Sequence, residues 1–206
     1  VERQPEELRV GGSIPSHGKM KKEKIKLIYG IGNEGDKFLN TKHNLGKEIV
    51  KYYYSKPKEL NFSFFEKFNH LILATNRGYV NESGLGLKEL KEKFKLKAEN
   101  ILVIHDDADL NFPLFKTSFG ASSAGHKGIE SIIKNIKTKN FWRLRIGLQG
   151  KKRVPAEEIV LKKWNYKEKI ILEKLKKKFK IILEKLDKGY LPNELNLPKN
   201  FFANEF

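Results

Sequence analysis

The chain has 206 residues, of which 39% are hydrophobic and 11% aromatic, so it is long enough for one well-buried domain and short for two. Its 42 basic and 25 acidic residues give a net charge of +17, which favours a polyanionic partner: nucleic acid first, an anionic membrane surface second. The absence of cysteine excludes disulfides, thiolate catalysis and cysteine-type zinc sites. No apolar run approaches the ~20 residues of a membrane span, so we expect a cytoplasmic protein that does not enter a membrane.

The N-terminal residues 1–19 are polar and show no periodicity, which predicts a flexible leader. The single methionine, Met20, stands directly before the first strand-like run. We therefore expect one folded domain over residues 20–206.

The first half of this region alternates between apolar runs and helical patterns. Residues 25–31 are an apolar run closed by glycine, which predicts a buried strand. Thr41 or Asn40 can cap a helix that continues to about residue 54. A second strand is predicted over 70–75, and Ser83 can cap a helix that continues to about residue 94.

The second half continues this alternation of strands and helices. It predicts a strand over 101–105 followed by acidic residues, an edge strand over 114–118, a small-residue loop over 120–125, a helix over 126–136, a strand over 142–148 and a lysine-rich amphipathic helix over 166–187. This order predicts a single three-layer α/β domain, with a mixed but mostly parallel sheet flanked by helices and a long C-terminal helix.

Polar side chains gather where predicted strands end. Ligands of such sheets bind beyond the carboxyl ends of the strands, and Asn33, residues 79–81 and Asp106 all lie there. His43 lies in the first turn of a predicted helix, whose dipole would keep its ring neutral, as a general base requires. Asp106 could accept the other ring N–H of that histidine. The alternatives are a surface or capping histidine, and strand-end aspartates that close turns or bind Mg²⁺.

Other polar residues each allow a functional and a structural interpretation. The amides of Asn33 and Asn81 could contact a substrate or a developing oxyanion, or could merely close their loops. Arg143 and Arg145 alternate on a strand and share a face, where they could grip phosphate or form a solvated surface. His126, taken alone, is more typical of a structural histidine than of a catalytic one.

Five segments in this order resemble the bacterial-type peptidyl-tRNA hydrolases. They are GIGNEGDKFLNTKHNLG, VNESG, HDDADL, GASSAGHKG and FWRLRIGL, and the resemblance covers about residues 25–190. It implies hydrolysis of the ester that joins a peptide to the terminal ribose of tRNA, which recycles tRNA from peptidyl-tRNA dropped off the ribosome. It also implies that no metal or organic cofactor is needed. The expected partner is the acceptor stem and CCA end of peptidyl-tRNA, with no obligate protein partner and a monomeric enzyme.

The resemblance also assigns roles to residues at matched positions. It implies that His43 is the general base and Asp106 its orienting partner. Asn33 would contact the substrate near the ester and help to discriminate N-blocked peptidyl-tRNA from free aminoacyl-tRNA. These three residues form the expected catalytic set.

A further set is expected to bind the substrate or the tRNA. Asn81 would bind the peptide backbone or the reacting carbonyl, Phe38 and Tyr79 would line the pocket for the tRNA 3′ end, and Arg145 would clamp the terminal phosphate. The whole substrate-binding set is Phe38, Tyr79, Asn81, Lys127, Arg143 and Arg145.

The chain departs from the family pattern at four positions. Phe38 replaces a tyrosine, Val80 a methionine, and Glu34 the proline of a turn, which we expect to loosen that turn. Lys127 replaces an asparagine and so puts a donor-only cation where an amide is usual. Near His43, this cation would lower the pKa of the imidazole. We therefore expect reduced or altered catalysis, with attraction to RNA phosphate as a possible gain.

Two alternatives remain at this point. The departure at Lys127 leaves open a non-catalytic RNA-binding relative that keeps the fold and the basic surface. A different phosphate-ester or nucleoside enzyme on a similar sheet is also open, because a fold alone does not determine a function.

Overall fold

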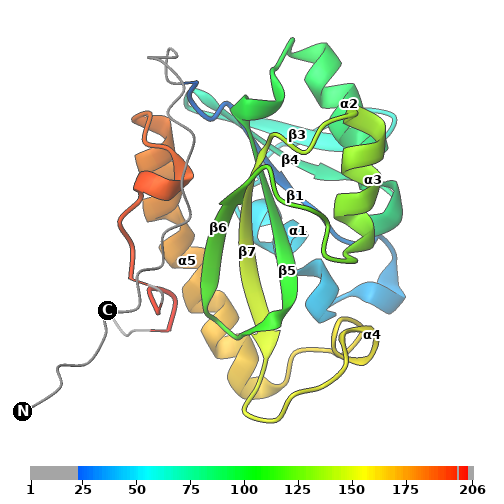
Figure 1. The fold of residues 1–206 in the computed structure, drawn as a ribbon, viewed down its shortest axis with the longest axis vertical. Helices are drawn as coiled ribbons and strands as arrows, with labels where there is room; N and C mark the ends of the chain where they lie inside the picture. The colour runs from blue at the N-terminus through cyan, green and yellow to red at the C-terminus, as the bar shows by residue number, and fades with distance from the viewer. Residues whose placement is uncertain (1–22, 199, 204–206) are drawn as a thin grey trace, which may run out of the picture.

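The protein is a three-layer α/β domain, seen in a computed structural model that describes residues 23–198 and 200–203 (Figure 1). The expected leader over 1–19 and the expected domain start at Met20 lie outside the described residues. The α-helices are α1 (Leu45–Lys51), α2 (Ser83–Lys93), α3 (Lys127–Ile136), α4 (Ala156–Ile159) and α5 (Tyr166–Asp187). Short 3₁₀ turns are η1 (Asp36–Phe38), η2 (Lys42–Asn44), η3 (Val80–Glu82), η4 (Ala98–Asn100) and η5 (Pro192–Glu194).

The middle layer is a seven-stranded sheet in the order β2-β3-β4-β1-β5-β7-β6. Its four central strands run parallel to one another, whereas β2, β3 and β6 pair antiparallel at the two sides. The predicted mixed, mostly parallel sheet is therefore confirmed. The strands are β1 (Leu27–Gly30), β2 (Lys58–Glu59), β3 (Ser63–Phe68), β4 (Leu71–Asn76), β5 (Ile101–Asn111), β6 (Phe115–Phe119) and β7 (Trp142–Gln149).

Helices cover both faces of the sheet because the central strands are apolar on both faces. In β1, Leu27 and Tyr29 belong to a core cluster with residues of α2 and α3. Ile28 points the other way, into a cluster with residues of α1 and α5. The alternation follows from the two-residue repeat of a strand, and a strand buried on both faces reads as a continuous apolar run.

Two glycines bring α1 into backbone contact with the sheet. A Cβ on Gly30 would lie 2.2 Å from the carbonyl oxygen of Gly46, and a Cβ on Gly46 would lie 2.1 Å from that of Ile104. Any side chain at either position would therefore push the helix away. This close packing sets the turn η2, which leads directly into α1, against β5.

The helix over 166–187 is confirmed as α5. Asn165 caps it, since its Oδ1 accepts from the backbone N–H of Glu168 at 3.0 Å, and the Glu168 carboxylate accepts from the Asn165 N–H in return. The predicted apolar stripe packs in the core beside the sheet, as its amphipathic pattern requires; it consists of Leu172, Leu175, Phe179, Ile182 and Leu186. Among the described residues, no helix is long and apolar enough to cross a membrane.

Two predicted helix starts were wrong. The Thr41 hydroxyl donates to the carbonyl of Phe38 and does not cap the helix, so the turn η2 precedes α1, which begins at Leu45. The Ser83 hydroxyl donates to the carbonyl of Val80, and Ser83 is the first residue of α2. In both places a 3₁₀ turn satisfies backbone groups that a side-chain cap would otherwise serve.

The strands also differ from prediction at three places. Strands β2 and β3 were not predicted; β3 gains its hydrogen bonds from pairing with β4. Strand β5 does not end before Asp106 but continues to Asn111, because β7 runs beside it and pairs with it through Asp107. The aspartates therefore lie within a strand and not in a loop after it.

Candidate active site

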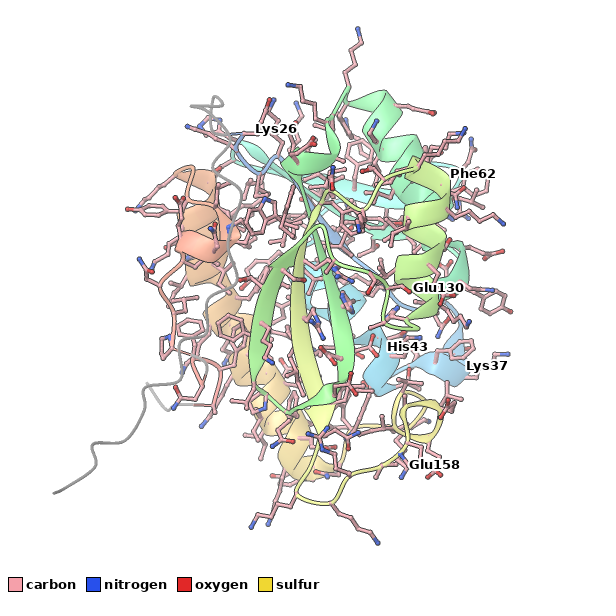
Figure 2. The ribbon with its side chains drawn as sticks, in the orientation of Figure 1. Lys26, Lys37, His43, Phe62, Glu130 and Glu158 are labelled. Carbon is pink, nitrogen blue, oxygen red and sulfur yellow. The ribbon has the colours of Figure 1, made fainter. Side chains whose placement is uncertain are left out.

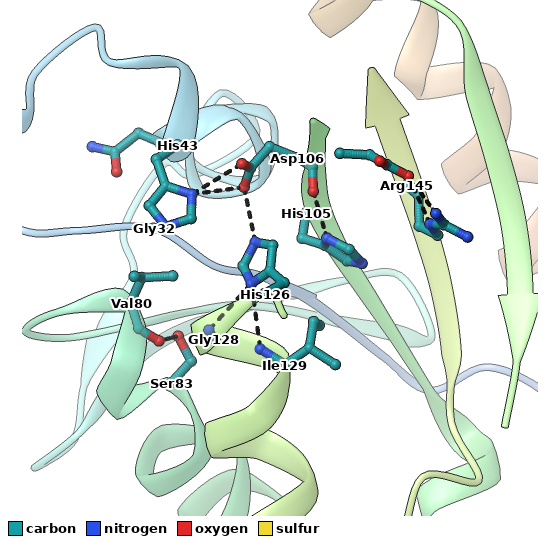
Figure 3. A network of polar contacts seen from close by, with 12 residues as sticks. Gly32, His43, Val80, Ser83, His105, Asp106, His126, Gly128, Ile129 and Arg145 are labelled. Carbon is teal, nitrogen blue, oxygen red and sulfur yellow. Dashed lines mark hydrogen bonds and ion pairs between the residues drawn. The ribbon is translucent and has the colours of Figure 1, made fainter. Parts of the chain in front are cut away.

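Three segments bring their polar side chains together around Asp106. His43 comes from η2, Asp106 from β5, and His126 from the residue that precedes α3 (Figure 3). The Nδ1 atom of His43 lies 3.0 Å from both carboxylate oxygens of Asp106, and Nε2 of His126 lies 3.0 Å from Oδ1. One buried carboxylate thus holds two imidazole rings.

The charge state of Asp106 determines which ring nitrogens carry protons. Burial alone would raise the pKa of this carboxyl, but the neighbouring charges of His43 and His126 and their hydrogen bonds hold it well below its usual range. As a carboxylate it can only accept, so Nδ1 of His43 and Nε2 of His126 donate to it. When the ring of His43 is neutral, its Nε2 is therefore free of a proton and basic.

The pKa of His43 is raised above its ordinary value. Burial disfavours the imidazolium, but the charge and hydrogen bonding of Asp106 outweigh that effect. The expectation that a helix dipole holds this ring neutral was wrong, since His43 lies in η2 before the helix begins. The carboxylate, and not the helix, controls this histidine.

His126 is the site residue that sequence reasoning undervalued. Its Nδ1 accepts from the backbone N–H groups of Gly128 at 3.1 Å and Ile129 at 3.4 Å, which caps α3. An accepting Nδ1 leaves the proton on Nε2, where it is donated to Asp106. The signal was its place as the first residue of the helix predicted over 126–136; the structure begins α3 one residue later, which makes His126 the cap.

His105 lies behind this group and supports it from within the sheet. Its Nδ1 donates to the carbonyl of Asp106 over 2.6 Å, and its ring centroid lies 4.7 Å from that of His126. Burial is the main reason why its pKa falls well below the usual value, so the ring is neutral. A neutral ring adds no charge to compete for the Asp106 carboxylate.

A cavity of about 450 Å³ opens beside the histidines. Five predicted site residues line it: His43, Asp106, Lys127, Arg143 and Arg145. The other predicted residues, Asn33, Phe38, Tyr79 and Asn81, do not. The chemical pair and the basic residues thus share one cavity, and the remaining residues lie outside its wall.

The two arginines on β7 are both engaged by protein groups. Arg145 donates to Asp107 Oδ2 from Nε at 2.8 Å and forms an ion pair from Nη2 at 2.6 Å. Arg143 donates to the carbonyl of Ser122 at 2.9 Å. Their predicted common face is confirmed by their place in one cavity. Asp107 is committed to Arg145, which leaves it poorly disposed for the alternative magnesium site.

Lys127 does not have the expected effect on His43, which was to lower the pKa of the imidazole. Its side chain is 72% exposed and its ammonium lies 3.1 Å from the carboxylate of Glu130. The pKa of His43 is set by burial and by Asp106, so the expectation that Lys127 lowers this pKa was wrong. Figure 2 labels both His43 and Glu130, the residue whose carboxylate lies beside the Lys127 ammonium.

Asn33 is held by two neighbouring loops. Its side-chain Oδ1 accepts from the backbone N–H of Val80 at 2.9 Å, and its own backbone N–H donates to Asn44 Oδ1 at 2.6 Å. Asn44 also donates to the carbonyl of Asn33 at 3.1 Å. Asn44, the residue directly after His43, therefore ties this loop to the turn η2 that carries His43, a role that the sequence did not predict.

Glu34 strengthens its turn, contrary to expectation. Its backbone N–H donates to the carbonyl of Gly78 at 2.9 Å, and its carboxylate accepts from the Gly78 N–H at 2.8 Å. The position that lacks the family proline is thus tied to the loop before η3 by two hydrogen bonds.

The aromatic residues form a separate group beside these loops. Phe38 and Tyr79 meet edge to face with ring centroids 6.0 Å apart, and the ammonium of Lys37 lies 4.9 Å from the Phe38 centroid. Asn81 is exposed in η3, two residues after Tyr79. The exposed Tyr79 ring and the half-buried Phe38 ring, beside a cation, provide a surface on which bases can stack.

The histidine group also has the composition of a metal site. His43, Asp106 and His126 each offer one ligand atom, and these atoms lie within 4.8 Å of one another. The same atoms already satisfy one another by hydrogen bonds, so a metal would have to displace protons from both rings.

Comparison with known proteins identifies the family. A sequence model described as peptidyl-tRNA hydrolase matches residues 27–200. The chain belongs to the peptidyl-tRNA hydrolase family. It is 39% identical to the peptidyl-tRNA hydrolase of Aquifex aeolicus over 154 residues, which are 70% of this chain and 80% of that protein. With the peptidyl-tRNA hydrolase of Hydrogenobaculum sp. it shares 36% identity over 154 residues, or 70% and 81% of the two chains.

A solved structure shares the fold of this family member. The crystal structure of peptidyl-tRNA hydrolase from Acinetobacter baumannii superposes with a TM-score of 0.65 at 24% identity, covering 87% of this chain and 98% of that one. The family resemblance of the five sequence segments and the predicted fold class are both confirmed.

Proposed function

We propose that this chain hydrolyses peptidyl-tRNA with His43 as the general base and Asp106 as the residue that orients it. The overall activity, cleavage of the ester between peptide and tRNA so that the tRNA is recycled, is that of the family to which the chain belongs. The observation that carries the assignment of roles is the pair of 3.0 Å contacts between His43 Nδ1 and the buried Asp106 carboxylate, beside a cavity.

The proposed chemistry follows from this pair. Neutral His43 takes a proton from a water molecule at Nε2 while the water oxygen attacks the ester carbonyl. Asp106 stabilises the imidazolium that forms, as the aspartate does in a serine hydrolase. Collapse of the tetrahedral intermediate breaks the bond to the ribose oxygen, which takes the proton from His43. The products are a peptide with a free carboxylate and a tRNA with a free hydroxyl.

The other predicted residues bind and position the substrate in this proposal. Asn33, held by Val80 and Asn44, contacts the substrate near the ester and helps to discriminate N-blocked peptidyl-tRNA from free aminoacyl-tRNA. Asn81 contacts the peptide backbone or the reacting carbonyl. Phe38 and Tyr79 form a stacking platform for the 3′ end of the tRNA. The residues that bind phosphate are Lys127, Arg143 and Arg145.

The tRNA partner suits the charge of the chain. A net charge of +17 attracts RNA, and we assign the contact to the acceptor stem and the CCA end. We further propose that the enzyme acts as a monomer in the cytoplasm. Measuring its mass in solution with and without tRNA tests the first point.

One assay tests the proposed roles. The protein is incubated with N-acetylated aminoacyl-tRNA, and release of the tRNA is compared for the unaltered chain, His43→Ala and Asp106→Asn. We expect release by the unaltered chain and a loss of at least about 100-fold in both variants. If His43→Ala still releases the tRNA, His43 is not the general base. Tight tRNA binding without release by the unaltered chain would favour the RNA-binding alternative.

A further inference from the structure

A second cavity, of about 520 Å³, lies behind the loop that carries Asn33. Asn33 and Asn44 line it, so this cavity and the catalytic turn share a wall. The cavity is also lined by residues of α1, of the segment that follows it and by a lysine of α5. Besides the two asparagines, the residues that the following argument uses are Glu34, Lys47, Glu48, Lys51, Tyr52, Phe64 and Lys176.

A buried lysine lines this cavity without a hydrogen-bond partner among the described residues, although the charge of Glu34 acts on it. Lys47 is 5% exposed, and its Nζ makes no hydrogen bond to any described residue. Burying an ammonium without a partner is unfavourable, and natural proteins nearly always pair such a group. The flexible four-carbon stem of a lysine lets Nζ turn toward an anion that enters beside it. A ligand that carries negative charge would supply the missing partner.

Three lysines and two glutamates line the cavity, so its lining carries one more positive charge than negative charges. The Glu48 carboxylate lies 3.6 Å from the Lys176 ammonium, and the Glu34 carboxylate accepts from the backbone N–H of Gly78. The Oε1 atom of Glu48 nevertheless makes no hydrogen bond within the described part of the chain, and the negative charge of Glu34 acts on Lys47. Lys47 and the exposed Lys51 remain to attract an anion, four residues apart on α1.

Aromatic side chains line the same cavity. Tyr52 is 44% exposed, and Phe64 on β3 is half-buried with the guanidinium of Arg77 lying 5.4 Å from its ring centroid. A cavity lined by lysines, by an exposed aromatic ring and by a half-buried one matches the two parts of a nucleotide, its phosphate and its base.

We propose that this second cavity binds the phosphate of a nucleotide, with Lys47 as its ion-pair partner and Tyr52 against its base. The nucleotide is either free in solution or part of an RNA strand, and both carry the same phosphate chemistry. Since Asn33 and Asn44 also line the cavity, an occupant would touch the two asparagines that hold the loop beside His43.

Calorimetric titration tests this proposal with adenosine 5′-monophosphate, with adenosine, and with a deacylated acceptor-stem minihelix. We expect the monophosphate to bind the unaltered chain, adenosine to bind at least tenfold more weakly, and Lys47→Met to weaken the monophosphate at least tenfold. If Lys47→Met weakens only the minihelix tenfold, the phosphate belongs to an RNA strand, which also supports the site. If it weakens neither, the proposal is overturned.

Two controls separate this site from the catalytic cavity. Arg145→Met and His43→Ala alter the first cavity, so binding of the monophosphate should survive in both; its loss there would place the ligand in the catalytic cavity and overturn the proposal. Hydrolysis is measured separately, so failure of either function is seen independently. Should Lys47→Met not fold, ¹³C-labelled lysine in the unaltered chain gives the answer, because the ligand must shift the Lys47 side-chain signals, and unshifted signals would refute the site.

Discussion

His126 holds Asp106 with one ring nitrogen and caps helix α3 with the other. Its Nε2 donates to Asp106 Oδ1 at 3.0 Å, and its Nδ1 accepts backbone N–H groups at 3.1 and 3.4 Å. The helix end therefore determines the tautomer of His126, and the tautomer determines that Asp106 receives a hydrogen bond from this side. His43 and His126 share one carboxylate, so changes at either ring should be felt at the other.

His126→Ala should lower both stability and turnover. Loss of the helix cap costs about 1 kcal/mol, and loss of a hydrogen bond to a buried carboxylate costs about 1.5–3 kcal/mol. With one donor gone, Asp106 attracts the His43 proton more strongly, so the rising limb of the pH–rate profile should move to higher pH. Denaturant unfolding and kcat against pH measure these effects. His126→Asn, which can still cap the helix, is the control, and an unmoved limb in both variants would contradict the coupling.

Turnover should rise with pH through the pKa of His43. The base is active only when neutral, and Asp106 raises its pKa above the usual value of about 6.5, so half-maximal kcat should lie above that pH. In Asp106→Asn the charge is gone but burial remains, so the limb should move below pH 6.5 while kcat falls about 100-fold or more. A limb that stays in place in this variant would show that another group controls it.

The same pair should make folding depend on pH. The folded pKa of His43 is raised, so the protonated ring contributes stability that is fully present below about pH 6.5 and is lost as pH rises through the folded pKa. The folded pKa of Asp106 is depressed, so its contribution is present above about pH 3.9 and is lost as pH falls below it. Urea unfolding of the unaltered chain and of His43→Gln across pH 4–8 measures this. A constant difference between the two chains would contradict the linkage.

Arg145→Met should weaken both tRNA binding and folding. It removes a cation from the proposed phosphate site and leaves Asp107, whose side chain is 6% exposed, without its ion-pair partner, at a cost of about 1–3 kcal/mol. The double variant Asp107→Asn, Arg145→Met removes the unpaired charge. It should regain most of the stability while KM stays high. Recovery of KM in the double variant would mean that Arg145 acts only through Asp107.

Lys127→Asn should leave the pH–rate limb of His43 unchanged, because burial lowers the pKa of that ring and Asp106 raises it, and the effect of Asp106 outweighs that of burial. Removing an exposed cation from the cavity rim should raise KM for tRNA about threefold at low salt and less at high salt. Equal KM values would take Lys127 out of tRNA binding, and a higher kcat in the variant would confirm that the lysine slows the chemistry. Lys134→Asn, on the same helix, controls for net charge.

Lys47→Met should stabilise the protein at neutral pH. Burial lowers the pKa of Lys47 from 10.5 to about 8, so the folded state holds its proton less tightly than the unfolded state. The resulting penalty, on the order of 2–3 kcal/mol, is complete below about pH 8 and disappears toward pH 10.5. Unfolding free energies of the variant and the unaltered chain at pH 7 and 10 measure it, with exposed Lys51→Met as the control. An equal difference at both pH values would exclude a charge effect.

Sequence reasoning reached the order of elements because periodicity and glycine are local signals. The run over 166–187 carries its own amphipathic stripe and an asparagine cap, and it became α5 with those bounds. Strand β3 was not predicted because it is stabilised by hydrogen bonds to β4, and such pairing cannot be recognised from the residues of β3 alone. The motifs that identify the family placed His43 and Asp106 together before any distance was known.

The sequence alone determined the alternation of strands and helices, the family and the residue types available for chemistry. Each of these depends on the spacing of residues that lie close together in the sequence. Only the tertiary structure decided how those residues act on one another. It placed His126 on the same carboxylate as His43, paired Asp107 with Arg145, turned Lys127 toward Glu130 and buried Lys47 without a hydrogen-bond partner in the ranges that the structure describes. Hydrogen-bond partners, tautomers and pKa shifts depend on distances between segments far apart in sequence, and only the packing of helices on the sheet sets those distances.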